Sequence, residues 1–491
     1  MTASRSGFAL TRFCRKWDHH HRPSRRVRRQ AASQRCMESL ESRTLMSGTW
    51  TTVDGLGALA LAADSAGNVY AIKGSTLSVR YAGGNPTDSI AWQALFQAPS
   101  SSFMFRDLAV DSVGNLYVCG LLPDATNPTL STGTLFERVA GGDGSFRPVD
   151  TIAAGGFDSI TVDSAGNVFT TAFVDVLSGR TNSTGSGKDK VTYPIYDDYG
   201  IVRRRGSTET SFQTVLNTTT GQPRYNEVAV VDSGPSAGVY VVGQDHATSG
   251  SPTQWLVLKS TTGTGSWSVQ DRFTGDPNVT GTAQAIVADR AGNVYVAGMA
   301  GWTEQSGTQK VKGVTQPIYQ ASQYWVVRKT TDGGDTWSTD DKYQRAAFNQ
   351  SIPFDIGLDA AGNLYAVGSS GSANTGWHGI IRTNTGGSWT TVDDFVGNGW
   401  QYRAFVADPV AGTLYAASPA LMRTSQGTLS TATTATTVLN LNTTVTVSHR
   451  SEPSSTKPSK ASNLKATNVA AIPATAPRQI WLARLAEELL G

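Results

Sequence analysis

The chain has 491 residues and a formal net charge of +3; 16% of its residues are charged and 39% are hydrophobic. The low charged fraction disfavours a long solvated helix or coiled coil, and no apolar run reaches the roughly 18 residues of a membrane-spanning helix. The three cysteines, Cys14, Cys36 and Cys119, lie far apart, which excludes a disulfide scaffold and a cysteine-ligated zinc site.

The charge is unevenly distributed along the chain. Residues 1–49 contain eleven basic and three acidic residues, and residues 428–491 contain six and three. The body between them, 50–427, contains 24 basic and 32 acidic residues. A basic arm can indicate nucleic-acid binding, but here it is joined to an acidic body. We therefore expect no nucleic-acid partner.

One sequence unit occurs seven times. It has a short apolar stretch, an Asp-x-x-Gly turn and a second apolar stretch with an aromatic residue, as in LAVDSVGNLYVCG at 108–120. Asp-x-x-Gly is typical of a type I turn closed by a left-handed glycine, and its carboxylate can accept hydrogen bonds from turn amides. Calcium would need several oxygens from one loop, so we interpret these aspartates as turn formers and expect no metal. They are Asp64, Asp111, Asp163, Asp232, Asp289, Asp359 and Asp408.

Two further strands follow each hairpin. The third strand contains a basic residue, namely Arg80, Arg138, Arg203, Lys259, Arg328, Arg382 or Arg423. The fourth begins near an aromatic residue, namely Trp92, Phe146, Phe212, Trp267, Trp337 or Trp389. The last copy lacks this strand, but GTWTTVD at 48–54 nearly repeats GGSWTTVD at 386–393. The sequence predicts an all-β, seven-bladed propeller of four-stranded blades over 48–427, with the N-terminal strand closing the last blade.

The repeat resembles the NHL and SBBP-type propeller families in its D-x-x-G-N-hydrophobic-Tyr-hydrophobic-x-G unit. This resemblance covers residues 48 to about 427 and implies a fold, because propellers have unrelated functions. Residues 330–337, TTDGGDTW, look like the Asp-box of sialidase-type propellers. In that family the box is a structural turn remote from the chemistry.

The two ends of the chain are predicted to be separate segments. Residues 1–47 are a basic leader without the apolar core of an ordinary secretory signal. Its LESRTLMSG at 40–48 resembles the L-E-x-R-x-L-L-S-G element of planctomycete leaders, which implies an extracellular or cell-surface location. Residues 428–476 are a disordered Ser/Thr/Pro-rich linker. Residues 477–491 have apolar residues at helical spacing and predict a short amphipathic helix.

The longest insertions fall between the second and third strands of the third and fifth copies, at 186–204 and 306–329, and both contain Pro-Ile-Tyr. Insertions on one face of a repeat array are typical of a binding face. Aromatic residues could stack on sugars or anchor a protein, and acidic ones could accept hydrogen bonds from hydroxyls. Alternatively, these loops pack on each other and cover the blade ends. The candidate ligand-binding residues are Tyr193, Tyr196, Asp197, Asp198, Trp302, Glu304 and Tyr319.

Evidence for catalysis is thin in the sequence. The propeller region contains two histidines, His246 and His378, too few for a typical imidazole-based metal site. Nothing singles out a pair of carboxylates for glycoside hydrolysis. The sequence therefore favours a monomeric, cofactor-free binding or scaffold propeller that recognises a glycan or a protein. A polysaccharide hydrolase or lyase and a purely structural cell-surface protein remain the alternatives.

Overall fold

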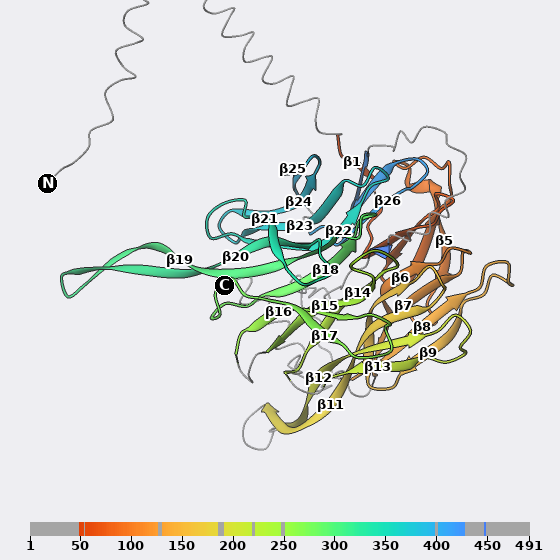
Figure 1. Ribbon diagram of the computed structural model, residues 1–491, viewed down its shortest axis with the longest axis horizontal. Coiled ribbons are helices and arrows are strands. Elements are labelled where there is room, and N and C mark those ends of the chain that lie inside the picture. The colour runs from red at the N-terminus through yellow and green to blue at the C-terminus, as the bar shows by residue number, and fades with distance from the viewer. Residues whose placement is uncertain are drawn as a thin grey trace, which may run out of the picture. The chain divides into compact units, whose positions relative to one another are not determined.

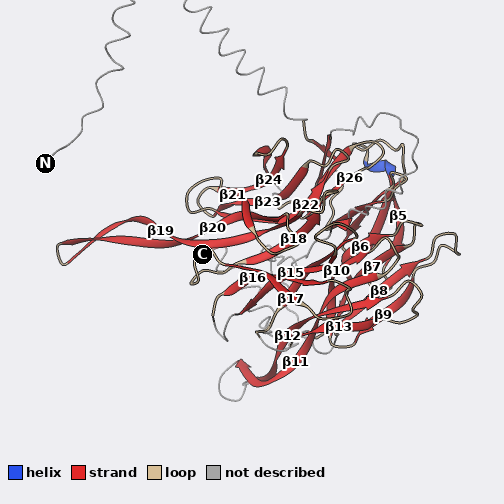
Figure 2. Cartoon of the chain, in the orientation of Figure 1, coloured by secondary structure: helices blue, strands red, loops and turns tan. Residues whose placement is uncertain are grey.

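The computed structural model describes residues 49–53, 55–125, 130–184, 191–218, 221–246, 251–397, 401–427 and 446–447. The chain divides into two units, Met1–Thr49 and Trp50–Gly491, and every strand belongs to the second. The predicted leader, and the linker and terminal helix apart from 446–447, lie outside the described residues. Within them the single helical segment is a 3-10 turn at Ser89–Ala91, and β-strands dominate (Figure 2).

The first three repeats each form an antiparallel meander of four strands. Repeat 1 contains β2 (Ala60–Ala63), β3 (Val69–Lys73), β4 (Thr76–Arg80) and β5 (Trp92–Gln97). Repeat 2 contains β6 (Met104–Val110), β7 (Leu116–Pro123), β8 (Ser131–Arg138) and β9 (Arg147–Ile152). Repeat 3 contains β10 (Gly155–Val162), β11 (Val168–Thr184), β12 (Val191–Arg205) and β13 (Gln213–Asn217).

The next three repeats have the same strand order. Repeat 4 contains β14 (Arg224–Val231), β15 (Gly238–His246), β16 (Thr253–Ser260) and β17 (Ser268–Phe273). Repeat 5 contains β18 (Thr282–Ala288), β19 (Val294–Val311), β20 (Val314–Thr330) and β21 (Ser338–Tyr343). Repeat 6 contains β22 (Gln350–Leu358), β23 (Leu364–Ser372), β24 (Gly376–Asn384) and β25 (Trp389–Val396).

The last repeat is completed from the other end of the chain. It contains β26 (Ala404–Ala407), β27 (Thr413–Ala417) and β28 (Met422–Gln426). Strand β1 (Thr51–Val53) adds to β28, with Thr52 opposite Arg423. A two-residue strand, β29 (Thr446–Val447), adds to the free edge of β2.

The predicted division into seven separate four-stranded blades is wrong. The described strands form five sheets of the size of one blade, four with four strands and one with five, and a single eight-stranded sheet. The eight-stranded sheet arises because the start of β20 pairs in parallel with the start of β22, through Gln323 and Gln350. Gln344 reinforces this junction by donating hydrogen bonds to Ser322 Oγ, at 2.7 Å, and to the carbonyl oxygen of Asn349.

The first strands of the repeats form a closed ring. Each contacts the first strand of the next repeat, from β2 through β6, β10, β14, β18 and β22 to β26, which contacts β2 again. Apolar side chains pack between successive sheets. Between the first and last sheets, for example, Ala71 and Trp92 of the first sheet meet Val53, Val406 and Tyr415 of the last sheet. The fold is thus an all-β propeller whose strand edges at the start and end of the chain are joined.

Successive repeats are also held together by a recurring ion pair. An arginine on the third strand of one repeat binds, through two nitrogen–oxygen contacts, an aspartate on the fourth strand of the preceding repeat. The pairs are Arg203–Asp150, Arg328–Asp271, Arg382–Asp341 and Arg423–Asp393. Each aspartate follows an aromatic residue by four positions, as in Trp337 to Asp341. We refer to these pairs as the inter-repeat clamps.

The predicted long loops are in fact strands. The insertion of repeat 5 is a hairpin, β19–β20, in which Val311 faces Val314 across the two-residue turn Lys312–Gly313. Both turn residues have positive φ, 50° and 84°, as a type I′ turn requires. Figure 1 shows this hairpin extending away from the other strands, while the β11–β12 hairpin of repeat 3 extends in a different direction.

Candidate binding site

The Asp-x-x-Gly turns have a repeated internal geometry. In repeat 1, Asp64 accepts hydrogen bonds from the backbone amides of Ala66, at 3.0 Å, and Asn68, at 2.9 Å, and from Asn68 Nδ2 at 2.7 Å. The same set of contacts recurs at Asp111, Asp163, Asp289 and Asp359. The carboxylate oxygens of these five aspartates are therefore used within their own turns.

Two of the seven recurrent aspartates behave differently. Asp232 accepts a hydrogen bond from the amide of Ser164 in the preceding repeat, at 3.4 Å. Asp408 accepts from the amides of Val410 and Ala411 and also binds Arg80 Nη2, at 2.7 Å. Their sequences, VDSGPSAG and ADPVAGT, depart from D-x-x-G-N, and the loss of the asparagine explains the loss of the shared pattern.

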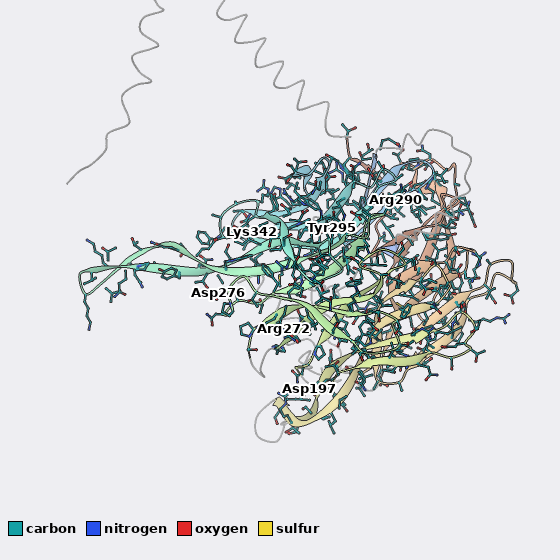
Figure 3. The ribbon with its side chains drawn as sticks, viewed as in Figure 1. Asp197, Arg272, Asp276, Arg290, Tyr295 and Lys342 are labelled. Atoms are coloured by element: carbon teal, nitrogen blue, oxygen red, sulfur yellow. The ribbon has the colours of Figure 1, made fainter. Side chains whose placement is uncertain are left out.

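A cavity of about 430 Å³ lies among the turns of repeats 1, 2, 5, 6 and 7. Its lining includes Asp64, Asp111, Asp289 and Asp359, but mostly consists of alanine, valine, leucine and glycine. Arg290, which Figure 3 labels, is at its wall and donates to the carbonyl oxygen of Ala360 at 3.3 Å. Because the four aspartates hold their own turns, this cavity presents an apolar wall with engaged carboxylates, which suits binding better than acid–base chemistry.

A second depression, of about 360 Å³, lies between repeats 3 and 4. Trp267, Tyr225 and His246 line it, together with the ion pair of Arg272 and Asp245, whose atoms are 2.7 Å apart. Burial raises the pKa of Asp245, and the Arg272 guanidinium opposes that rise. Sequence reasoning did not single out this place, because its residues come from five strands, β13 to β17, and the connections between them.

The candidate residues of repeat 5 are engaged at the base of the β19–β20 hairpin. Trp302 packs edge-on against Tyr324, with ring centroids 5.1 Å apart, and Lys342 Nζ lies 3.7 Å from the centroid of the Trp302 ring. Glu304 accepts a hydrogen bond from the Tyr324 hydroxyl at 2.5 Å. Burial and this hydrogen bond raise the pKa of Tyr324 to about 12. Trp302 and Glu304 thus fix the hairpin to its sheet.

The candidate residues of repeat 3 lie along the β11–β12 hairpin. Asp197 forms an ion pair with Arg180, and Asp198 binds Arg224 Nη1 at 2.6 Å. Tyr196 is opposite Leu177, while Tyr193 is opposite Asn182. Figure 3 labels Asp197 on this hairpin and Lys342 near the base of the other, and the two places are well separated. The structure therefore does not gather the candidate residues of repeats 3 and 5 into one site.

The outer part of the β19–β20 hairpin has an unexpected property. Val311, Val314 and Ile318 are 39%, 62% and 39% exposed. Val311 and Val314 are directly opposite, and Ile318 is four residues after Val314, so all three share one face. Tyr319, 61% exposed, lies on the other face. The alternation in QKVKGVTQPIY was a signal for this stripe that the loop interpretation overlooked.

Within the ranges that the structure describes, there is no group of three or more His, Cys, Asp or Glu residues positioned to hold a metal ion. No helix in those ranges is long and apolar enough to cross a membrane.

Comparison with known proteins assigns the chain to no family. No family model matches the chain, and no curated protein matches it. Among solved structures, the chain is similar to one described as the crystal structure of the WD40 beta propeller domain of Doa1, with a TM-score of 0.41 and 12% sequence identity. That similarity covers 77% of this chain and 96% of the other.

Proposed function

We propose that this propeller is a non-catalytic binding module that recruits a protein partner through the outer part of its β19–β20 hairpin. The observation that carries the proposal is the exposed stripe of Val311, Val314 and Ile318 on the outer part of the hairpin, residues 304–320, whose backbone pairs with no other described strand. A two-stranded hairpin alone is marginally stable in water, and exposed apolar groups on a projecting element are typical of an interaction site.

A protein partner fits this hairpin better than a glycan does. Sugar recognition relies on accessible aromatic faces, whereas the Trp302 ring is covered by Lys342 and Tyr324, which leaves Tyr319 as the exposed aromatic candidate of this hairpin. The exposed stripe is aliphatic, and the hairpin edges carry backbone groups that a partner strand could pair with. The resemblance of the leader to export leaders supports the further proposal that the module works outside the cell or at its surface.

The test is quantitative affinity capture with the full chain from cells that produce it. We expect the triple variant Val311→Ser, Val314→Ser, Ile318→Ser to capture at least tenfold less of a partner that the wild type captures specifically. A matched control, Gln309→Ser with Gln316→Ser, alters the same face without removing apolar groups and should retain that partner. An identical set of captured proteins from wild type and triple variant would overturn the proposal. Retention on a glycan array that depends on Tyr319 would replace it with the glycan alternative.

A further inference from the structure

The centre of the strand ring is occupied by the chain itself. Strand β29 pairs antiparallel with β2, Val447 opposite Leu61 and Thr446 opposite Ala62. It also contacts β6, β22 and β26, which are the first strands of their repeats. Because β3 takes the other edge of β2, the edge that β29 occupies faces the interior of the ring.

The edge of β2 and the segment that adds to it are both uncharged. Strand β2 is Ala-Leu-Ala-Ala and carries no charged side chain. The first strand of a sheet also presents unpaired backbone groups that favour addition of a strand. Residues 431–448 contain no charged side chain, and 443–447 read Thr-Thr-Val-Thr-Val, a β-branched sequence typical of strands.

The connecting chain is long enough for this placement. Thr446 comes 19 residues after Gly427, and 19 extended residues span roughly 60 Å. A folded domain of this size has a radius of gyration of about 21 Å. The number of residues between Gly427 and Thr446 is therefore sufficient to reach β2 from the end of the last repeat.

We propose that the ring interior is a binding site for an extended, uncharged β-strand, and that Thr446–Val447 of this chain is its resident occupant. The strand adds to β2 and touches the repeats at both ends of the chain, β2 and β6 on one side and β22 and β26 on the other. It thereby links repeats 1 and 2 to repeats 6 and 7, which meet where the ring closes.

Cysteine pairing in the full chain tests this placement. In a Cys14→Ser, Cys36→Ser background, Ala62→Cys with Thr446→Cys places the two cysteines directly opposite across an antiparallel pair, where Cβ atoms are about 4.5–5.5 Å apart. We expect a disulfide within one chain in most molecules under mild oxidation. The matched control, Gln97→Cys with Thr446→Cys, uses an exposed residue on β5, the outermost strand of the same sheet, and should not cross-link. Cross-linking of the control at an equal or greater rate would overturn the proposal.

Hydrogen–deuterium exchange gives an independent readout if the cysteine variants fail to fold. Thr446→Pro removes an amide from β29 and is expected to speed exchange in the peptide that contains β2 by at least fivefold. Thr436→Pro, ten residues earlier, is the control and should leave that exchange unchanged. Equal exchange of the β2 peptide in wild type and Thr446→Pro would contradict the proposed occupant.

Discussion

Arg80 and Asp408 join the two ends of the ring. Arg80 Nη2 lies 2.7 Å from Asp408 Oδ2 although 328 residues separate them, and both side chains are 2% exposed. Arg80 also donates to the carbonyl oxygen of Gly84 at 2.8 Å and lies over the ring of Tyr415. The last Asp turn has thus exchanged the usual asparagine contact for a contact with the first repeat.

Removing Arg80 leaves a buried carboxylate without its cation. We expect Arg80→Met to lower the free energy of unfolding by about 3–5 kcal/mol, as for other broken buried pairs. Arg147→Met breaks the exposed, solvent-screened pair with Asp143 and should cost far less. Urea denaturation of both variants measures the difference, and equal losses would show that Arg80 does not hold the ring closed.

The inter-repeat clamps should behave as coupled pairs. Arg382 holds Asp341 at 2.7 and 2.8 Å, and burial raises the pKa of Asp341 despite the arginine. Arg382→Met alone should be strongly destabilising because it leaves the buried carboxylate of Asp341 without its cation. Adding Asp341→Leu should recover about 1–4 kcal/mol, since an apolar pair can replace a buried ion pair. A double-mutant cycle measures this, and strictly additive losses would argue against the clamp.

Asp355 gives the stability a defined dependence on pH. It accepts hydrogen bonds from the amides of Ile356 and Phe405 on neighbouring first strands, and burial, with a further contribution from Asp107, raises its pKa well above the usual value. The folded protein therefore binds this proton more tightly than the unfolded chain. Its stabilising contribution is full below pH about 4 and is lost as the pH rises through the folded pKa.

The Asp355→Asn variant removes this titration. We expect the difference in melting temperature, wild type minus Asp355→Asn, to decrease as the pH is raised from about 4 to 8. Thermal melts of both proteins across that range provide the measurement. A difference that grows with pH would mean that the carboxyl is stabilised in its charged form.

The glycine of the Asp turn is required for its backbone conformation. Gly362 has φ +88° and open space around the position of a Cβ atom, so Gly362→Ala should cost about 1–2 kcal/mol from conformation alone. Gly307 in the β19–β20 hairpin also has open space but does not have a positive φ. Gly307→Ala is the matched control and should be close to neutral by the same denaturation assay, whereas equal costs would remove the conformational explanation.

Local pattern and long-range pairing were not equally visible in the sequence. Asp64 and Asn68 are four residues apart, so the turn chemistry could be predicted from the repeat itself. The pairing of Gln323 with Gln350 joins two repeats at one position, and no periodicity indicates it. The prediction of the blade count failed there for that reason.

The candidate site also combines features that are local in the sequence with contacts between distant residues. Tyr319 and Trp302 were identified by type and position, but the lysine that covers Trp302 comes from β21, 40 residues later. The role of Arg328 also stayed hidden, because its partner Asp271 belongs to the preceding repeat. A signal existed in the recurrence of aspartate four residues after Trp267, Trp337 and Trp389.

The most direct test of the proposed function shortens the β19–β20 hairpin. Glu304 and Gln320 are opposite each other, so residues 305–319 can be replaced by an Asn-Gly turn that keeps Trp302, Tyr324 and Lys342 in place. Affinity capture with this variant, alongside a thermal melt, tests function and folding together. We predict an unchanged fold, with a melting temperature within about 4 °C of wild type, and loss of the partner. A folded variant that captures the same partner as wild type would contradict the account.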